Sequence, residues 1–267
     1  FKHFLMYPYY LPSLPATGAR LATLTIDNAR VIVGGRAIRA NILVEDEKIK
    51  SVGSRENRGA DQRIDARGKL VLPGLVDGHA HLYDPAFTNR EDFASGTAAA
   101  LAGGVTTVVE MVLSTPVDTP ERVKAKIREG ERTSLIDFSL HAGMMNLHNL
   151  QNVRRLTKLG IRSFKTFTCK PYYVDDHGLM SLLRETAAQH SILNVHAEDE
   201  RTANENFEKL TSNGRRDAMA HALWRPNVAE ERAVKKVIAY AHSLGARVHI
   251  SHLSTAESAT AIKAAQK

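Results

Sequence analysis

The stretch Val71-Leu-Pro-Gly-Leu-Val-Asp-Gly-His-Ala-His-Leu82 decides the fold, because an apolar run that predicts a β-strand ends here in two histidines. Side chains two residues apart on a strand face the same side, so His79 and His81 can point into one cavity. This is a metal-binding geometry. A bare His-x-His motif also arises by chance in a chain with 12 histidines, so the pair alone leaves a structural interpretation open.

The composition is that of an ordinary globular protein of 267 residues, with 43% hydrophobic and 24% charged residues. This length holds one large α/β domain or two smaller ones. The 36 basic and 29 acidic residues give a net charge of +7, but they are scattered along the chain. Nucleic-acid binding normally needs clustered basic residues, so we expect no nucleic-acid partner. No apolar stretch approaches the roughly 20 residues that span a bilayer, so we expect no membrane partner.

The cysteine content and the two ends of the sequence bear on the compartment of the protein and on whether the chain is complete. The single cysteine, Cys169, excludes an intramolecular disulfide and agrees with a reducing compartment, which predicts a cytoplasmic protein. We expect residues 1–20 to be a poorly ordered lead-in rather than a signal peptide, because three prolines interrupt the apolar start. The chain begins without Met and stops inside a predicted helix, which predicts a fragment of a longer protein.

Residues 21–68 predict a small β module. Short strands are expected at 21–26, 30–33 and 38–44, with a Gly34-Gly35 turn between the second and third, and Ile49 and Val52 mark a returning hairpin strand. The module is too short to close a sandwich by itself, so we expect an incomplete β-sandwich portion.

From residue 69 to 267 predicted strands and helices alternate. After the strand that carries His79, strands are predicted at 105–113, 135–142, 161–167, 192–196 and 247–251. Capping residues, prolines and glycines delimit a helix that follows Thr88-Asn89 and runs through Leu101, and further helices at 119–130, 147–159 and 176–187. Two or three helical pieces, one of them at 228–244, are expected between the last two strands. Repeated β/α units predict an α/β fold with a parallel sheet, and we expect a (β/α)8 TIM barrel of which about six units are present. An open doubly wound sheet is the alternative, disfavoured because no Gly-x-Gly-x-x-Gly follows the first strand.

Histidines and one lysine stand at the ends of these predicted strands, where a barrel places its chemistry. Besides His79 and His81, these residues are Lys165, His196 and His252. Their sequence intervals fit whole β/α units, except that the interval between the last two is too long for one unit. We therefore expect an insertion around residues 198–226.

In these motifs the sequence resembles the cyclic amidohydrolases, a group that includes dihydropyrimidinase or hydantoinase, allantoinase and dihydroorotase. The matching stretches are Pro73–His81, Gly96-Thr97 with Ala102–Thr107, Ser163–Phe167, Val195–Glu198, Arg225-Pro226 with Glu230, and Val248–Ser254. The resemblance runs from about Leu24 to the end of the chain. It implies a metal-dependent hydrolase barrel over residues 69–267, with a β-sandwich built from both ends of the protein.

By this resemblance, Lys165 is carboxylated by CO2 and bridges two divalent metal ions. His79 and His81 would bind one ion, and His196 and His252 the other. Carboxylation needs the neutral amine, which burial near positive charge favours. Imidazole ligands make zinc the expected metal, with manganese, iron and cobalt as alternatives.

Other residues near these motifs receive weaker assignments. Asp77 is a candidate to orient an imidazole N–H. His249 lies three residues before His252, so in a regular strand the two would face opposite ways, and we expect His249 to be a packing residue or to lie behind the ligands. For His141 two roles remain possible from the sequence: a position near the metals or a structural role. The residues left as structural are Cys169, His148, His221 and His242.

The resemblance implies hydrolysis of a ring amide by a hydroxide held between the two metals. The family's general base is an Asp after strand eight. This sequence ends before that strand, so the Asp is absent and the activity of this exact span is open.

The substrate is expected to be a hydantoin, allantoin or a dihydropyrimidine. Dihydroorotases carry an Arg two residues after the second histidine, where this chain has Tyr83, so dihydroorotate is the alternative. Hydantoinases carry a Tyr five residues after the lysine, where this chain has Lys170, closely followed by Tyr172 and Tyr173. These three tyrosines are the candidate substrate-binding residues. A catalytically silent scaffold or subunit is the alternative of another class, metal storage is a third, and a homo-oligomer, dimer or tetramer, is expected for the full-length protein.

Overall fold

The computed structural model describes residues 23–46, 48–55, 59–113 and 115–266. The predicted lead-in, residues 1–20, lies outside the described residues. The chain divides into two compact units, whose described parts lie within residues 23–75 and 76–266.

The first unit is a single β-sheet. Its strands are β1 (Thr23–Val33), β2 (Arg36–Glu45), β3 (Lys48–Gly53), β4 (Gln62–Asp65) and β5 (Leu70–Val71). The order is β3-β2-β1-β4, and β5 also pairs with β1. The two strands predicted at 21–26 and 30–33 are one strand, β1, whose pairing register shifts where Asn28 adopts a positive φ of 55°. Completion of a sandwich stays a prediction.

The second unit contains the six strands of the predicted β/α repeat. They are β6 (Leu75–Ala80), β7 (Val105–Met111), β8 (Asp137–His141), β9 (Ser163–Phe167), β10 (Ile192–His196) and β11 (Arg247–Ile250). They form two three-stranded sheets, β6-β7-β8 and β9-β10-β11. A parallel bridge between Ala142, directly after β8, and Phe164, near the start of β9, joins the two sheets. The strands thus follow one another in sequence order without the reversal of a doubly wound sheet.

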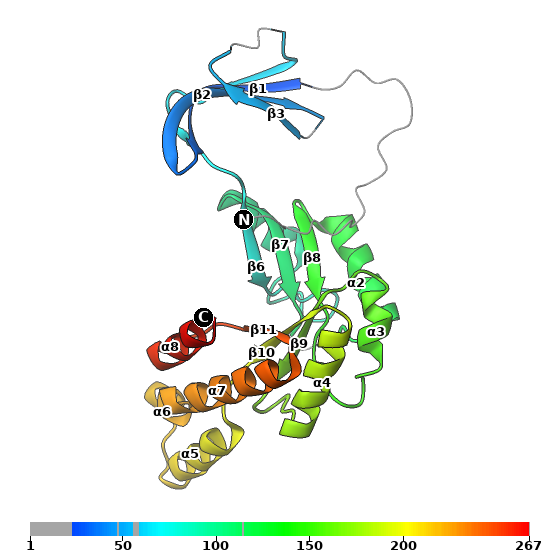
Figure 1. The fold of residues 1–267 in the computed structure, drawn as a ribbon, viewed down its shortest axis with the longest axis vertical. Coiled ribbons are helices and arrows are strands. Elements are labelled where there is room, and N and C mark those ends of the chain that lie inside the picture. The colour runs from blue at the N-terminus through cyan, green and yellow to red at the C-terminus, as the bar shows by residue number, and fades with distance from the viewer. Residues whose placement is uncertain (1–22, 47, 56–58, 114, 267) are drawn as a thin grey trace. The chain divides into compact units, whose positions relative to one another are not determined.

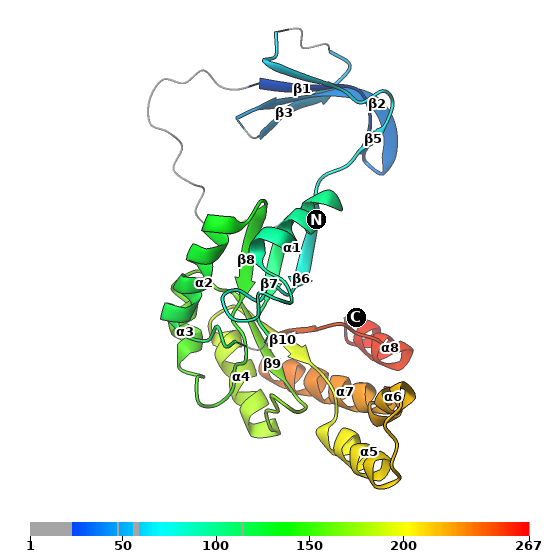
Figure 2. The ribbon, with the colours of Figure 1, turned by 180° about the vertical axis from the view of Figure 1, so that it is seen from behind.

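Eight helices are described between and after these strands (Figure 1). They are α1 (Phe93–Ala102), α2 (Pro120–Thr133), α3 (Asn152–Thr157), α4 (Asp176–Ala188), α5 (Glu200–Ser212), α6 (Ala218–Trp224), α7 (Asn227–Leu244) and α8 (Ala256–Ala265). The view from behind shows α1 against the β6–β8 strands and α4 and α7 beside β9 and β10 (Figure 2). The insertion predicted between β10 and β11 folds as α5 and α6.

Local sequence explains where the helices begin and end. The Thr119 side chain accepts the backbone N–H of Arg122, and Pro120 occupies the first turn, so α2 begins as predicted. Asp175 rather than Asp176 caps α4, because its side chain accepts the N–H of Gly178. Gly245 ends α7 in the left-handed conformation, with φ 60°.

The apolar core of this unit lies between the strands and the helices. Phe164 of β9, Leu193 of β10 and Val237 of α7 are fully buried in it. Packing of this core holds the carboxyl ends of the strands in fixed positions. None of the described helices is long and apolar enough to cross a membrane.

Candidate metal centre

The five predicted metal-binding residues line one cavity of about 300 Å³. His79 lies on β6 and His81 directly follows it, Lys165 lies on β9, His196 ends β10, and His252 follows β11. Strand alternation turns the side chains that lie on strands inward, and the residues that follow β6 and β11 reach the same cavity from the strand ends. The structure therefore brings together residues up to 173 positions apart in the sequence (252 minus 79).

The four imidazoles form a row. The ring centroids of His81 and His79 lie 5.2 Å apart, those of His79 and His252 lie 5.7 Å apart, and those of His252 and His196 lie 4.5 Å apart. Two histidines come from the first sheet and two from the second. The row therefore places four imidazoles, the side chains predicted as metal ligands, next to one another.

Lys165 lines the same cavity and is buried, with 2% of its surface exposed. Its Nζ donates a hydrogen bond of 2.6 Å to Ser251 Oγ, which is also buried. Burial lowers the pKa of Lys165 from 10.5 to about 7. A large fraction of this amine is therefore neutral near pH 7, the form that reacts with CO2.

Two of the imidazoles, those of His79 and His252, are held neutral by their surroundings. Burial, with the nearby Lys165, lowers the pKa of His79 to about 4. Burial, with the nearby His196, lowers the pKa of His252 to about 4. His81 Nδ1 lies 2.6 Å from the Met111 carbonyl oxygen, which can only accept, so Nδ1 carries the proton and Nε2 keeps a free lone pair.

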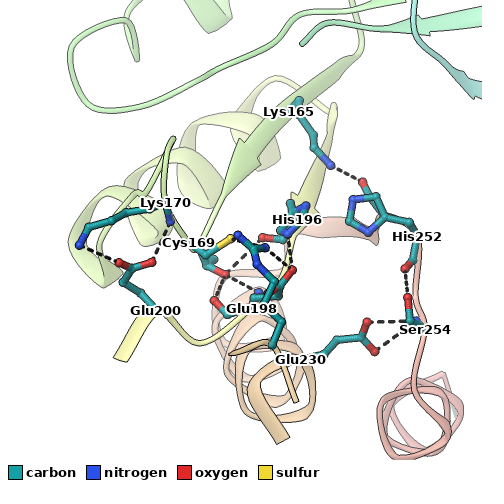
Figure 3. A network of polar contacts seen from close by, with 12 residues as sticks. Lys165, Cys169, Lys170, His196, Glu198, Glu200, Glu230, His252 and Ser254 are labelled. Atoms are coloured by element: carbon teal, nitrogen blue, oxygen red, sulfur yellow. Dashed lines mark hydrogen bonds and ion pairs between the residues drawn. The ribbon is translucent and has the colours of Figure 1, made fainter. Parts of the chain in front are cut away.

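His196 is oriented by a carboxylate (Figure 3). Its Nε2 lies 2.7 Å from Glu198 Oε1, and the same oxygen accepts from Arg225 at 2.8 Å. Burial alone would raise the pKa of Glu198, but the bonds from His196 and Arg225 lower it on balance, so the carboxylate stays ionised at neutral pH. The Nε2 proton is thereby fixed, and Nδ1 of His196 is left free as a ligand atom.

His252 reaches the cavity because the chain leaves the strand before it. β11 ends at Ile250, and His252 has a positive φ of 41°. Glu230 of α7 holds the following turn by accepting the backbone N–H groups of Ser254 and Thr255. The expectation that His249 and His252 face opposite ways assumed a regular strand and does not apply here. His249 pairs in register with Asn194, which pairs with Lys165, so these three side chains share one face.

The weaker assignments separate in the structure. The Tyr83 ring lies 6.1 Å from that of His81, and Tyr172 lines the cavity against Phe167. Tyr173 instead lines a neighbouring pocket. Asp77 Oδ1 accepts the backbone N–H of His79 at 3.0 Å rather than an imidazole N–H. Substrate contacts of the tyrosines stay predictions.

A second group of donor atoms adjoins the row. The ligand atoms of Cys169, His196 and Glu198 lie within 4.8 Å of one another. Arg225 lies against this group, 2.8 Å from Glu198 Oε1 and 3.9 Å from Cys169 Sγ, and its positive charge opposes a cation there. Burial raises the pKa of Cys169 to about 11, which keeps the thiol protonated. Cys169 therefore fits the structural role predicted for it.

The donor set fits divalent metal ions. It consists of four imidazoles and a buried lysine that would offer two carbamate oxygens when carboxylated. Zinc is bound through such nitrogen and oxygen donors. The carboxylate that orients His196 is the outer partner that metal-binding histidines commonly have.

Comparison with known proteins agrees with this geometry. The family model described as "Dihydro-orotase-like" matches residues 68–258. The chain belongs to this family of cyclic amidohydrolases. Among cyclic amidohydrolases, a dihydroorotase from Methanothermobacter thermautotrophicus is 37% identical over 233 residues, which cover 87% of this chain and 52% of that protein. An allantoinase from Rubrobacter xylanophilus is 34% identical over 251 residues, which cover 91% of this chain and 55% of the relative.

A solved cyclic amidohydrolase structure has the same fold. The L-hydantoinase (dihydropyrimidinase) from Arthrobacter aurescens superposes with a TM-score of 0.85 at 28% identity, covering 92% of this chain and 56% of that one. The chain thus spans about half the length of the relatives it matches. Dihydroorotase, allantoinase and hydantoinase all occur among the relatives, so the comparisons place the chain in the group without choosing its substrate.

Sequence reasoning missed the residues that support the ligands. Ser251, Glu198 and Arg225 contact Lys165 or His196, or each other, yet none was predicted to do so. A signal existed for Glu198, which follows His196 by two residues. No sequence pattern pointed from Arg225 to Glu198, because they lie 27 positions apart and two helices lie between them.

Proposed function

We propose that the protein hydrolyses a C–N bond in a cyclic amide or ureide, with two divalent metal ions held by the row of histidines and by carboxylated Lys165. Zinc is the expected ion. The observation that carries the proposal is the buried lysine, with its pKa lowered to about 7, in one cavity with four histidines.

The residues of this chain have separate tasks. His79 and His81 would hold one ion, and His196 and His252 the other. Lys165 would supply the oxygens of its carbamate to both, once its neutral amine has formed an N–C bond to CO2 and released one proton. Two such ions, when bound, polarise the ring carbonyl and activate the attacking water. Glu198 fixes the His196 proton on Nε2, and Met111 does the same for Nδ1 of His81.

Proton transfer to the leaving nitrogen needs a further group. No carboxylate is among the described residues that line the cavity. The resemblance assigns this step to an Asp after strand eight, beyond the six strands of the described unit. Activity is therefore best tested in the protein produced from its complete reading frame.

We propose hydantoin, allantoin or dihydropyrimidine as the substrate, with dihydroorotate as the alternative. Tyr83 stands where dihydroorotases carry an Arg, and it stacks near His81 rather than offering a cation to a substrate carboxylate. The 37% identity to a dihydroorotase is the observation that keeps the alternative open.

Hydrolysis of the four ring substrates, measured side by side, tests the proposal. We expect turnover of at least one, and loss of about 10³-fold or more in kcat for Lys165→Ala, because the bridging ligand carries both ions. Lys158→Ala, on an exposed residue of the same unit, is the matched control and should keep full activity. A folded, metal-loaded protein that turns over none of them would favour the silent scaffold instead.

A further inference from the structure

His141 ends β8 and is 7% exposed, yet it takes no place in the histidine row. Its Nε2 lies 3.0 Å from the carbonyl oxygen of Gly78, and its Nδ1 lies 2.6 Å from Ser163 Oγ. A carbonyl oxygen can only accept, so Nε2 carries the proton and Nδ1 accepts from the serine hydroxyl. Both ring nitrogens are used, and neither is left for a metal ion.

The partners of His141 lie on both halves of the unit. Gly78 belongs to β6 in the first sheet, and Ser163 belongs to β9 in the second. Asn194 of β10 joins the same group, with its Nδ2 3.4 Å from His141 Nδ1. The imidazole on β8 thus contacts β6, β9 and β10. None of these three strands is the neighbour of β8 within its sheet, which is β7.

Each partner is a near neighbour of a predicted metal ligand. Gly78 shares a peptide bond with His79, Ser163 precedes Lys165 by two residues, and Asn194 precedes His196 by two residues. The Gly78–His79 peptide is held from both sides, because His141 donates to the Gly78 oxygen and Asp77 accepts from the His79 N–H. Strand alternation then fixes where the His79 and His81 side chains point.

We propose that His141 is a positioning residue that ties the Gly78–His79 peptide of β6 to Ser163 and Asn194 of the opposite sheet, and so sets the spacing between the two halves of the metal site. The proposal rests on the proposed function, because it concerns the same ions. It assigns His141 no contact with metal or substrate.

Three substitutions distinguish an effect of the His141 hydrogen bonds from an effect of the volume of its ring. His141→Gln can still donate an amide N–H toward Gly78. His141→Asn keeps a polar group near Ser163 but is too short to reach Gly78, and His141→Phe keeps a ring while removing both bonds. His242→Gln, on an exposed histidine of α7, is the matched control.

The measurement is zinc affinity by competition with a chelator, together with hydrogen exchange of the 75–82 segment in the metal-free protein. We expect His141→Asn and His141→Phe to weaken at least one ion by about 10- to 100-fold, and to speed exchange in 75–82. His141→Gln should lie closer to the wild type in both, and His242→Gln should match it.

Two results would overturn the proposal. One is wild-type affinity for both ions in His141→Asn, and the other is an equal loss in the Asn and Gln variants, which would make ring volume the cause. If His141→Phe fails to fold, the difference in zinc affinity between His141→Asn and His141→Gln still tests the proposal. A wild-type protein that binds no zinc would instead refute the proposed function, so the two failures are distinguishable.

Discussion

Glu198 is the carboxylate that holds His196, one of the proposed metal ligands, in place. Its Oε1 lies within hydrogen-bonding distance of both His196 and Arg225, while its Oε2 is buried without a hydrogen-bonding partner among the described residues. The carboxylate therefore fixes the ring orientation of His196 and balances the charge of Arg225. Its negative charge also raises the basicity of the imidazole toward an ion on Nδ1.

Replacing this carboxylate by an amide should weaken the site without unfolding it. We expect Glu198→Gln to lower metal affinity or kcat/KM by about 10- to 100-fold, because the charge behind His196 is lost and Arg225 is left unpaired. Metal titration and steady-state kinetics measure the two effects. Glu205→Gln, on the exposed face of α5, is the control. Unchanged affinity and unchanged kcat/KM in Glu198→Gln would exclude the orienting role.

At the residue scale, the sequence predicts which side chains come together in the site. It does not predict the hydrogen bonds and backbone conformations that position them. The ligand positions follow from strand ends and spacing, because alternation fixes the facing of His79 and His81. The positive φ of His252 and the contact between Lys165 and Ser251 depend on tertiary packing, which no local pattern carries. His141 could not be assigned for the same reason.

At the scale of elements, helix α2 is anchored on β7 by a buried ion pair. Lys126 Nζ lies 3.2 Å from Glu110 Oε1 and also donates to the carbonyl oxygens of Leu82 and Asp84. Both side chains are at most 5% exposed. Burial raises the pKa of Glu110 to about 7 despite the nearby Lys126, so the carboxyl can lose its charge at little cost near neutral pH.

The two partners should therefore respond differently to substitution. We expect Lys126→Met to lower the free energy of unfolding by about 3–5 kcal/mol, because Glu110 and two carbonyls lose their partner. Glu110→Gln should cost less, because it mimics the protonated acid. Urea denaturation measures both, with the exposed Lys124→Met as control. Equal losses in Lys126→Met and Lys124→Met would contradict the anchoring role.

The elements themselves were largely predictable. β7 was expected from its β-branched run and α2 from its Thr-Pro-Glu start, and both lie where predicted. Two or three helical pieces were expected between the strands at 192–196 and 247–251, and the structure has three there, α5, α6 and α7. Only the last of them had bounds predicted from the sequence. The hydrophobic pattern also did not show that residues 23–33 form one strand. That strand, β1, pairs with β2 on both sides of a register shift, and the pattern alone does not fix the register.

At the scale of the whole molecule, burying neutral histidines makes stability depend on pH. The pKa of His79, His141 and His252 is lowered from 6.5 to about 4, in each case chiefly by burial. Between these values the unfolded chain binds more protons than the folded one, so stability rises with pH. Glu110, with its raised pKa, acts in the opposite direction between 4.5 and about 7, but it is one group against three.

The free energy of unfolding of the metal-free protein should therefore rise between pH 4 and 6.5. For the nearly buried His141, the shift corresponds to about 3 kcal/mol at 1.36 kcal/mol per pKa unit. Urea denaturation across this range checks the slope, and His141→Gln should flatten it. A wild-type stability that is constant or falls from pH 4 to 6.5 would show that these histidines are not held neutral.

The architecture of the larger unit was predicted from the alternation of strands and helices, and six strands in sequence order agree with it. Closure of a barrel and completion of the sandwich need strands beyond those described, so they stay predictions. The choice of substrate depends on loop side chains such as Tyr83 and Tyr172, whose contacts neither the sequence pattern nor the family fixes.

Elemental analysis of the protein from its complete reading frame, reconstituted with zinc and bicarbonate, tests the two-metal site most directly. We expect about two zinc ions per chain, an intact mass increased by one CO2, and loss of both in Lys165→Ala but not in Lys158→Ala. A folded wild-type protein that retains no zinc after this treatment would contradict the assignment of His79, His81, Lys165, His196 and His252 as metal ligands.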